Sequence, residues 1–287
     1  MFEVIFLVLL GIVWLVFASI QDFKKNEIAN WLNFSLIIFA LGFRFFYSLF
    51  NASPDFVGFE FFIQGIFGLG FFFIVSLAFY YSRFFAGGDA KLLIALGAIL
   101  AFYFSIKLNL ILFAIFLFVF LFVGSIYGLF WAGYLSIKNF QNFKKRFFND
   151  LRKNKNLIKV IFGGVFVLLV AGIFNFIFIV YGFVLFIFVL LFFYLEAVDK
   201  SCMRKKIKTS ELVEGDWLYN EIKIKNKKIK PHWEGLNKEQ ISFIRKNLKY
   251  VNIKQGIPFA PVFLISFLIL VYLYYSGFAL ELFKVFF

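Results

Sequence analysis

Long apolar runs recur along this chain and alternate with short polar segments. Eight of them predict membrane-spanning helices, because a helix needs about 20 mostly apolar residues to cross the hydrocarbon core of a bilayer. They lie near residues 2–20, 30–50, 59–82, 91–106, 109–135, 157–174, 177–197 and 259–280. The stretch 157–197 is too long for one crossing, and its polar break at Asn175 predicts a tight hairpin there. The pattern predicts an all-α polytopic membrane protein with about eight transmembrane helices.

Two longer polar segments divide the apolar runs. We expect five parts: a membrane block, a basic amphipathic segment, a helical hairpin, an insertion subdomain and a final helix, at residues 1–137, 138–160, 161–197, 198–256 and 257–287 respectively. In the amphipathic segment, Phe140, Phe143, Phe147 and Leu151 recur at helical spacing among lysines and arginines. This pattern is typical of a helix that lies on anionic lipid.

The insertion at 198–256 is polar enough to fold outside the membrane. Alternating apolar residues from Trp217 to Ile229 predict a short β-hairpin that turns around Asn226. Farther on, Asn237 and Gln240 have the spacing of a helix cap, and Ile241, Ile244 and Leu248 follow as one apolar stripe. The sequence therefore predicts a small α+β subdomain.

The distribution of charge indicates the orientation in the membrane. The chain is 63% hydrophobic and has a net charge of +14. If the N-terminus is outside, the segments 21–29, 83–91, 138–160 and 198–256 face the cytoplasm and hold 27 of the 30 basic residues. Lys and Arg are retained on the cytoplasmic side in short loops. This orientation explains the positive charge without nucleic acid, and the first run, which carries Glu3, is expected to be a retained helix of a multi-pass cell-membrane protein.

Several kinds of chemistry lack the residues that they need. Cys202 is the only cysteine and His232 the only histidine, so the chain has neither an internal disulfide nor a zinc ligand set of these residues. No Ser-His-Asp set, His-Glu-x-x-His motif or phosphate-binding loop is found. We therefore expect no cofactor and no metal.

Acidic residues at two apolar boundaries are the strongest candidates for chemistry. Asp89 lies in Ala86-Gly87-Gly88-Asp89-Ala90-Lys91, between two apolar runs. An acid at the start of a helix is commonly a simple N-cap. That reading does not explain Gly87 and Gly88, which permit positive φ and a close approach of backbone, as an extended peptide would need. Lys91 reads as a side chain that snorkels to lipid headgroups.

The second acid is Asp22, just after the first apolar run. Alone, it reads as a hydrated residue at a helix end. The expected topology, however, places Asp22 and Asp89 at the same membrane face. Two carboxyl groups within a few ångströms share one proton, so one can deprotonate a water while the other hydrogen-bonds to a scissile carbonyl. The residues therefore suggest an aspartyl protease that forms no covalent intermediate.

These motifs resemble those of the type IV prepilin and preflagellin peptidases, membrane aspartyl proteases of the Gly-x-Gly-Asp group. The matching residues are Asp22, Asn30, Trp31, Gly88, Asp89 and Lys91, and the segment Gly256-Ile257-Pro258-Phe259 resembles the one that leads into the last helix of archaeal members. The resemblance implies cleavage of class III leader peptides, between a basic leader and the hydrophobic helix of a pilin or archaellin precursor, at the cytoplasmic face. It also implies that the lipid bilayer is a partner.

The sequence differs from the family motif at two positions, and other functions are compatible with it. Ala86 replaces the first glycine of the motif, and Ala29 replaces the usual proline before Asn30. The four-cysteine region of the bifunctional bacterial branch is absent, so no methyltransferase activity is expected. Three alternatives stay open: a presenilin-like or signal-peptide-peptidase-like intramembrane protease, a transporter or channel that binds a cation at Asp89, and a non-catalytic scaffold.

Overall fold

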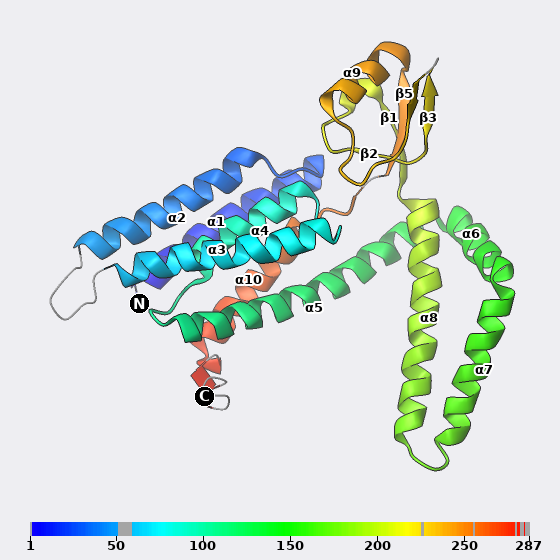
Figure 1. Cartoon of the computed structure of the whole chain (residues 1–287), viewed down its shortest axis with the longest axis horizontal. Coiled ribbons are helices and arrows are strands. Elements are labelled where there is room, and N and C mark those ends of the chain that lie inside the picture. Colours follow the sequence, from blue (N-terminus) through cyan, green and yellow to red (C-terminus); the bar gives the residue numbers. More distant parts are fainter. Residues whose placement is uncertain are drawn as a thin grey trace. The chain divides into compact units, whose positions relative to one another are not determined.

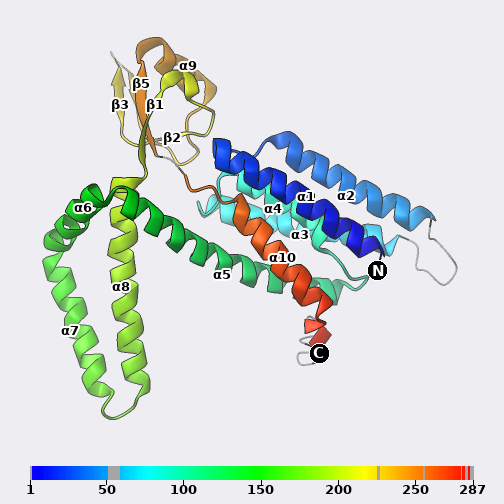
Figure 2. The same ribbon diagram turned by 180° about the vertical axis from the view of Figure 1, so that it is seen from behind.

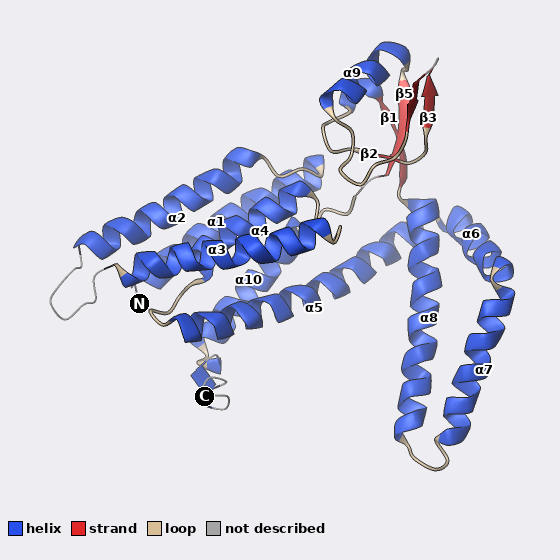
Figure 3. Cartoon of the chain, in the orientation of Figure 1, coloured by secondary structure: helices blue, strands red, loops and turns tan. Residues whose placement is uncertain are grey.

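The chain forms two compact, mostly helical units. The computed structural model describes residues 2–50, 59–224, 227–254, 256–278, 280, 281 and 284 (Figure 1). One unit consists of residues 1–128 and 257–287, and the other of residues 129–256. Strands within the described residues belong to the second unit (Figure 3). This arrangement confirms the predicted class, a mostly helical membrane protein with a small α+β region.

The first unit is a bundle around the short helix α4. Its helices are α1 (Phe2–Lys25), α2 (Asn30–Phe50), α3 (Glu60–Tyr81), α4 (Gly87–Leu100), the first part of α5 (Ile106–Lys138) and α10 (Ala260–Tyr275). Helix α4 packs mainly against α3 and α2 and also touches α1, whereas α10 runs along α1 (Figure 2). Nine residues of α4 are buried, so this helix forms the centre of the unit.

The number of helices that can span a membrane is smaller than predicted. Within the described residues five helices are long and apolar enough: α1, α2, α3, α5 and α8 (Ile177–Cys202). A bent pair of helices, α6 (Phe140–Lys153) and α7 (Lys155–Ala171), would make a sixth if the pair forms one span. The expected runs 91–106 and 259–280 give helices of only 14 and 16 residues. Apolar composition does not fix where a helix ends: α4 stops before Ala101, whose ψ of 82° is not helical. Eight spans is therefore corrected to five or six.

Helices α3 and α4 approach until their backbones touch. A Cβ atom on Gly97 would lie 2.5 Å from the carbonyl oxygen of Gly68 and 2.9 Å from Cβ of Phe72. Small residues at a crossing let membrane helices gain dispersion contacts that larger side chains would prevent. The glycine pair therefore sets the distance between α3 and the helix that carries Asp89.

The second unit begins with a helical hairpin. Helix α6 (Phe140–Lys153) is followed by α7 (Lys155–Ala171), which packs against α8 across a turn that contains Asn175. The side-chain oxygen of Asn175 accepts a hydrogen bond from the backbone of Ile177 at 3.0 Å. Helix α6 lies in the predicted amphipathic segment, and Phe143 on its apolar face packs against Tyr194 of α8 with ring centroids 5.4 Å apart. That part of the apolar face is covered by protein.

The insertion forms the predicted α+β fold. A three-stranded antiparallel sheet has the order β1 (Arg204–Lys208), β5 (Tyr250–Lys254), β2 (Trp217–Leu218), and a separate hairpin pairs β3 (Ile222–Ile224) with β4 (Lys227–Ile229). The short 3-10 helix Thr209–Glu211 follows β1, and α9 (Lys238–Asn247) precedes β5. Asn237 and Gln240 form the expected capping box of α9. The predicted turn residue Asn226 lies outside the described residues.

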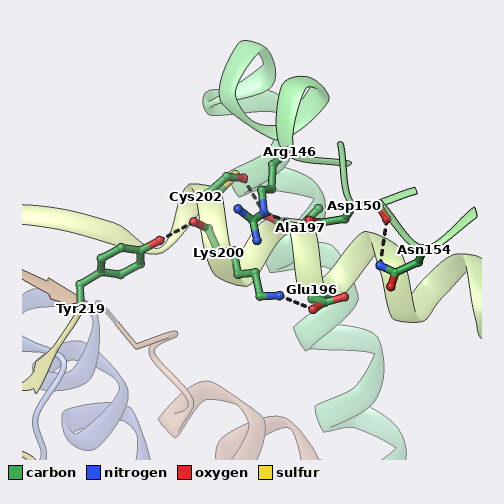
Figure 4. Close-up of polar contacts among 9 residues, drawn as sticks. Arg146, Asp150, Asn154, Glu196, Ala197, Lys200, Cys202 and Tyr219 are labelled. Carbon is green, nitrogen blue, oxygen red and sulfur yellow. Dashed lines mark hydrogen bonds and ion pairs between the residues drawn. The ribbon is translucent and has the colours of Figure 1, made fainter. Parts of the chain in front are cut away.

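Polar contacts join the insertion to the end of α8. The hydroxyl group of Tyr219 donates to the backbone carbonyl of Lys200 at 2.6 Å (Figure 4). Lys254 pairs with Asp199 at 2.5 Å. Nearby, Arg146 of α6 pairs with Asp150 at 2.9 Å, also visible in Figure 4. The sheet is therefore held to the helix from which it emerges.

Candidate active site

Asp22 lies inside α1, one turn before its last residue, and not beyond the end of the helix as the sequence suggested. The helix continues to Lys25 and ends where Asn26 takes a φ of +50°, with its N–H bonded to the carbonyl oxygen of Asp22 at 2.8 Å. Asparagine tolerates this left-handed conformation, which terminates helices. The Asp22 side chain is only 6% exposed, so the reading as a hydrated residue is wrong.

The carboxylate of Asp22 is held by the start of α10. Its Oδ2 accepts a hydrogen bond of 2.8 Å from the backbone N–H of Ala260, the first residue of that helix. The N-terminus of a helix favours negative charge because its first N–H groups have no partner within the helix. The contact joins residues 238 positions apart in the sequence, and it connects both ends of the first unit at a candidate catalytic group.

Asp89 is the third residue of α4, and the N-cap position before the helix is taken by Ala86. The simple N-cap reading therefore does not apply. The helix is too short to be a membrane span, and Asp89 is only partly buried in its first turn. Two effects raise the pKa of Asp89 to about 7: the loss of hydration, which is the larger, and the negative charge of Asp22. A hydrogen bond from the Ala86 backbone lowers this pKa in part. The two predicted acids thus come from α1 and α4 and interact electrostatically.

Gly87 and Gly88 form the first turn of α4, and neither has a positive φ. The expectation that these glycines serve a left-handed backbone is therefore wrong, because the helix already begins at Gly87. A Cβ on Gly88 would meet Ile28 at an ordinary 3.6 Å, whereas a Cβ on Gly87 would have no atom within 4 Å. Open space beside the first turn is compatible with an approaching peptide, which stays a prediction.

Lys91 and Asn30 form a direct link between α4 and α2. The ammonium group of Lys91 donates to the side-chain oxygen of Asn30 at 2.7 Å. Lys91 therefore has a protein partner, beyond the contact with lipid headgroups that the sequence suggested. The bond joins the first residue of α2 to the second turn of α4.

Replacing Lys91 with alanine is expected to cost less than about 1 kcal/mol of stability, because the bond to Asn30 is exposed. The peptide hydrolysis that the sequence resemblance implies should fall by a factor of only about 5, equivalent to roughly 1 kcal/mol. Thermal unfolding and initial rates of Lys91→Ala measure both effects, with the exposed Lys24→Ala as a control for loss of a positive charge. A rate loss beyond a hundredfold would mean that Lys91 contacts the reacting groups.

Aromatic residues hold the segments around both acids, and the sequence interpretation missed them. Phe85, two residues before α4, is 7% exposed and packs against Phe120, Phe259 and Phe263 at centroid distances of 5.7, 6.2 and 5.9 Å. The hydroxyl group of Tyr127 donates to the carbonyl oxygen of Pro258 at 2.8 Å. Because the chain contains 51 phenylalanines, composition alone gave no signal for these few.

The part of the chain that the structure describes contains no group of three or more His, Cys, Asp or Glu side chains suited to a metal ion. Cys202 is buried at the end of α8 in the second unit. His232 lies in the insertion, 3.7 Å from Glu234.

Comparison with known proteins gives a match to a family model. Residues 9–133 match the model of the Type IV leader peptidase family, and this segment includes Asp22, Asn30, Asp89 and Lys91. No curated protein and no solved structure matches the chain. The match supports the resemblance at family level and leaves the archaeal subtype unresolved. Residues 9–133 of the chain are therefore similar to the Type IV leader peptidase family.

Proposed function

We propose that the chain is a membrane aspartyl endopeptidase that cleaves the leader peptides of type IV pilin or archaellin precursors at the cytoplasmic face. The observation that carries this proposal is that Asp22, near the end of α1, and Asp89, in the first turn of α4, both lie within residues 9–133, the segment that matches the family. Two acids from α1 and α4 supply the groups that hydrolysis by an activated water requires.

The surroundings favour different roles for the two acids. Asp22 acts as the base, because the N–H of Ala260 at the start of α10 stabilises its ionised form. Asp89 acts as the acid, because its raised pKa of about 7 leaves about half of the molecules with a protonated Asp89 at neutral pH. Asp22 takes a proton from a water whose oxygen attacks the scissile carbonyl carbon, while Asp89 gives its proton to the carbonyl oxygen.

Collapse of the resulting diol restores the enzyme. Protonated Asp22 gives its proton to the departing amide nitrogen, and ionised Asp89 takes a proton from one hydroxyl group of the diol as the C–N bond breaks. The products are a carboxylic acid and an amine, and both acids return to their starting states. No covalent intermediate forms.

The raised pKa of Asp89 predicts how the rate depends on pH. Because the protonated acid is the active form and this pKa is that of the free protein, kcat/KM should fall as pH rises through about 7, by tenfold per unit above it. Initial rates between pH 5 and 9 with a leader peptide that has no group titrating in this range measure the effect. A rate that stays constant up to pH 9 would remove Asp89 as the acid.

The distribution of charge supports the proposed orientation. With the N-terminus outside, α1, α2 and α3 each cross the membrane once, so the end of α1 and the start of α4 face the cytoplasm together with Lys24, Lys25, Arg83 and Lys91. The hydrophobic helix of a precursor would enter from the lipid and present the bond before it at the level of the two acids. Gly87 leaves open space at this level. Substrates of this class are the precursors that the family name implies.

Two of the alternative functions, a presenilin-like protease and a transporter, can be compared with the structure. Asp22 lies within α1, so its position in the fold is also compatible with a presenilin-like protease. The family match over residues 9–133 now favours the leader peptidase. A transporter would use Asp89 as a cation site without hydrolysis.

Cleavage by the purified protein tests the proposal. The protein in proteoliposomes is mixed with a precursor peptide that has a basic leader and a hydrophobic helix, and mass spectrometry locates the cut. One cut at the junction is expected, and a control peptide with the helix replaced by a polar sequence should stay intact. Cuts within the hydrophobic helix would indicate an intramembrane protease, and ion flux without hydrolysis would indicate a transporter.

A further inference from the structure

Arg44 is a fully buried cation in the middle of the first unit. It belongs to α2 and is 0% exposed. No carboxylate among the described residues forms an ion pair with it. A buried charge is costly unless other groups compensate it, and a charge within a membrane helix is a functional hypothesis by default. The compensating groups of Arg44 therefore indicate what it does.

The guanidinium group binds the C-terminal end of α4. Nε donates to the carbonyl oxygen of Ala98 at 2.9 Å, and Nη2 donates to those of Ile99 and Ala101 at 3.0 and 2.7 Å. Nη1 donates to the carbonyl oxygen of Phe61 in α3 at 2.9 Å. The last carbonyl groups of a helix lack partners and carry partial negative charge, which an arginine can satisfy.

The surroundings of Arg44 are shaped for it. The carbon of the guanidinium group lies 4.3 Å from the ring centroid of Phe61. A Cβ on Gly65 would approach Nε of Arg44 to 2.9 Å, so the glycine in α3 leaves room for the side chain. The planar fork of arginine can serve several carbonyl groups at once, which the point charge of lysine cannot. The arrangement is specific to an arginine.

Helix α4 needs the contact with Arg44 because it is short. The helix has 14 residues and ends in the interior of the unit, where no lipid group can satisfy its carbonyl oxygens. At its other end, Ser76 donates to the carbonyl oxygen of Ala90 at 2.7 Å. Contacts at both ends thus hold the helix, and Asp89 lies in its first turn, about 14 Å along the axis from Ala98 at 1.5 Å per residue.

We propose that Arg44 is a positioning residue for the reaction. By binding the end of α4 it fixes the depth and rotation of the helix, and thereby the separation of Asp89 from Asp22. This inference rests on the proposed function, because it assigns Arg44 to the same pair of acids. A displacement of about 1 Å in a catalytic group can reduce a rate a hundredfold.

The test compares Arg44→Met with Asn109→Ala. Asn109 is also buried, and its side chain bonds Gln64 and the backbone of Tyr103, but no residue of α4. Both variants should unfold at lower temperature. For Arg44→Met, kcat per folded molecule should fall by 10-fold to 100-fold with KM within twofold, whereas Asn109→Ala should keep the kcat of the unaltered protein. Equal kcat values in both variants would reduce Arg44 to a structural role.

Arg44→Lys provides the comparison if the methionine variant fails to fold. Lysine keeps the charge but can reach fewer of the four carbonyl groups, so an intermediate kcat is expected, together with a shifted pH dependence as the separation of the acids changes. Full kcat with an unchanged pH profile would overturn the proposal.

A distance measurement separates this inference from the proposed function. Spin labels at Lys24→Cys and Gly87→Cys, in a Cys202→Ser background, report the separation between the end of α1 and the start of α4. Arg44→Lys should broaden or shift the distance distribution, whereas Asn109→Ala should leave it unchanged. If the unaltered protein cleaves no leader peptide, the proposed function fails, and this distribution still decides whether Arg44 holds α4. An unchanged distribution would contradict the inference.

Discussion

Replacing Asp89 with asparagine is expected to lower the rate of leader-peptide hydrolysis by on the order of 10³-fold or more. Asparagine has nearly the same shape but cannot give up a proton to the carbonyl oxygen. Asp89 is only partly buried in the first turn of α4, so the variant should fold. Single-turnover rates with a precursor peptide, together with thermal unfolding of the same preparation, measure both quantities.

Asp22→Asn should have a similar effect on the rate for a different reason. The amide oxygen can still accept the hydrogen bond from Ala260, so the start of α10 keeps its contact. The variant cannot, however, take a proton from water. Because the two acids act as one unit, the double variant should be hardly slower than either single one.

Glu27→Gln is the matched control for these variants. Glu27 is an exposed acid five positions after Asp22, and the same charge is removed from the same region. Its rate should stay within about twofold of the unaltered protein, since it is solvated and in high dielectric. If Asp22→Asn or Asp89→Asn kept a comparable rate in folded protein, that acid would not belong to the mechanism.

Local patterns in the sequence predicted local structure well. The spacing of Asn237 and Gln240 gave the capping box of α9, because both groups of the motif lie within one helical turn. The break at Asn175 likewise falls in the turn between α7 and α8. Such features depend on neighbours a few residues away, which a single sequence shows directly.

Contacts between distant segments could not be predicted in the same way. The sequence placed both acids at one membrane face, but it gave no sign that Ala260 would bind Asp22, or that Arg44 would satisfy the end of α4. A short helix that ends inside a bundle is unfavourable unless another group satisfies its last carbonyl groups. The sequence does not show such a group, and the apolar run 91–106 therefore predicts a full span. The run 91–106 does not form a full span, and the arginine that satisfies the end of α4 lies on α2.

Gly97→Ala is expected to be the most damaging conservative change outside the acids. The new Cβ would lie 2.5 Å from the carbonyl oxygen of Gly68, and a backbone atom cannot rotate away as a side chain can. Helices α3 and α4 must therefore separate. Overpacking of this kind costs about 1–3 kcal/mol of stability. Asp89 lies eight residues earlier on the same helix, so its displacement should also lower kcat by about a hundredfold.

Gly70→Ala is the matched control, because it makes the same change on α3 at a position where a Cβ would have no atom within 4 Å. Alanine favours a helix by up to about 1 kcal/mol relative to glycine, so this variant should be as stable as the unaltered protein or more so. Thermal unfolding and kcat are measured for both variants in the same detergent. The crossing of α3 and α4 would have no part in placing Asp89 if Gly97→Ala matched Gly70→Ala in both. If kcat falls in Gly97→Ala but not in Gly70→Ala, the distance between the backbones of α3 and α4 controls the position of Asp89. The absence of a methyl group at Gly97 sets that distance.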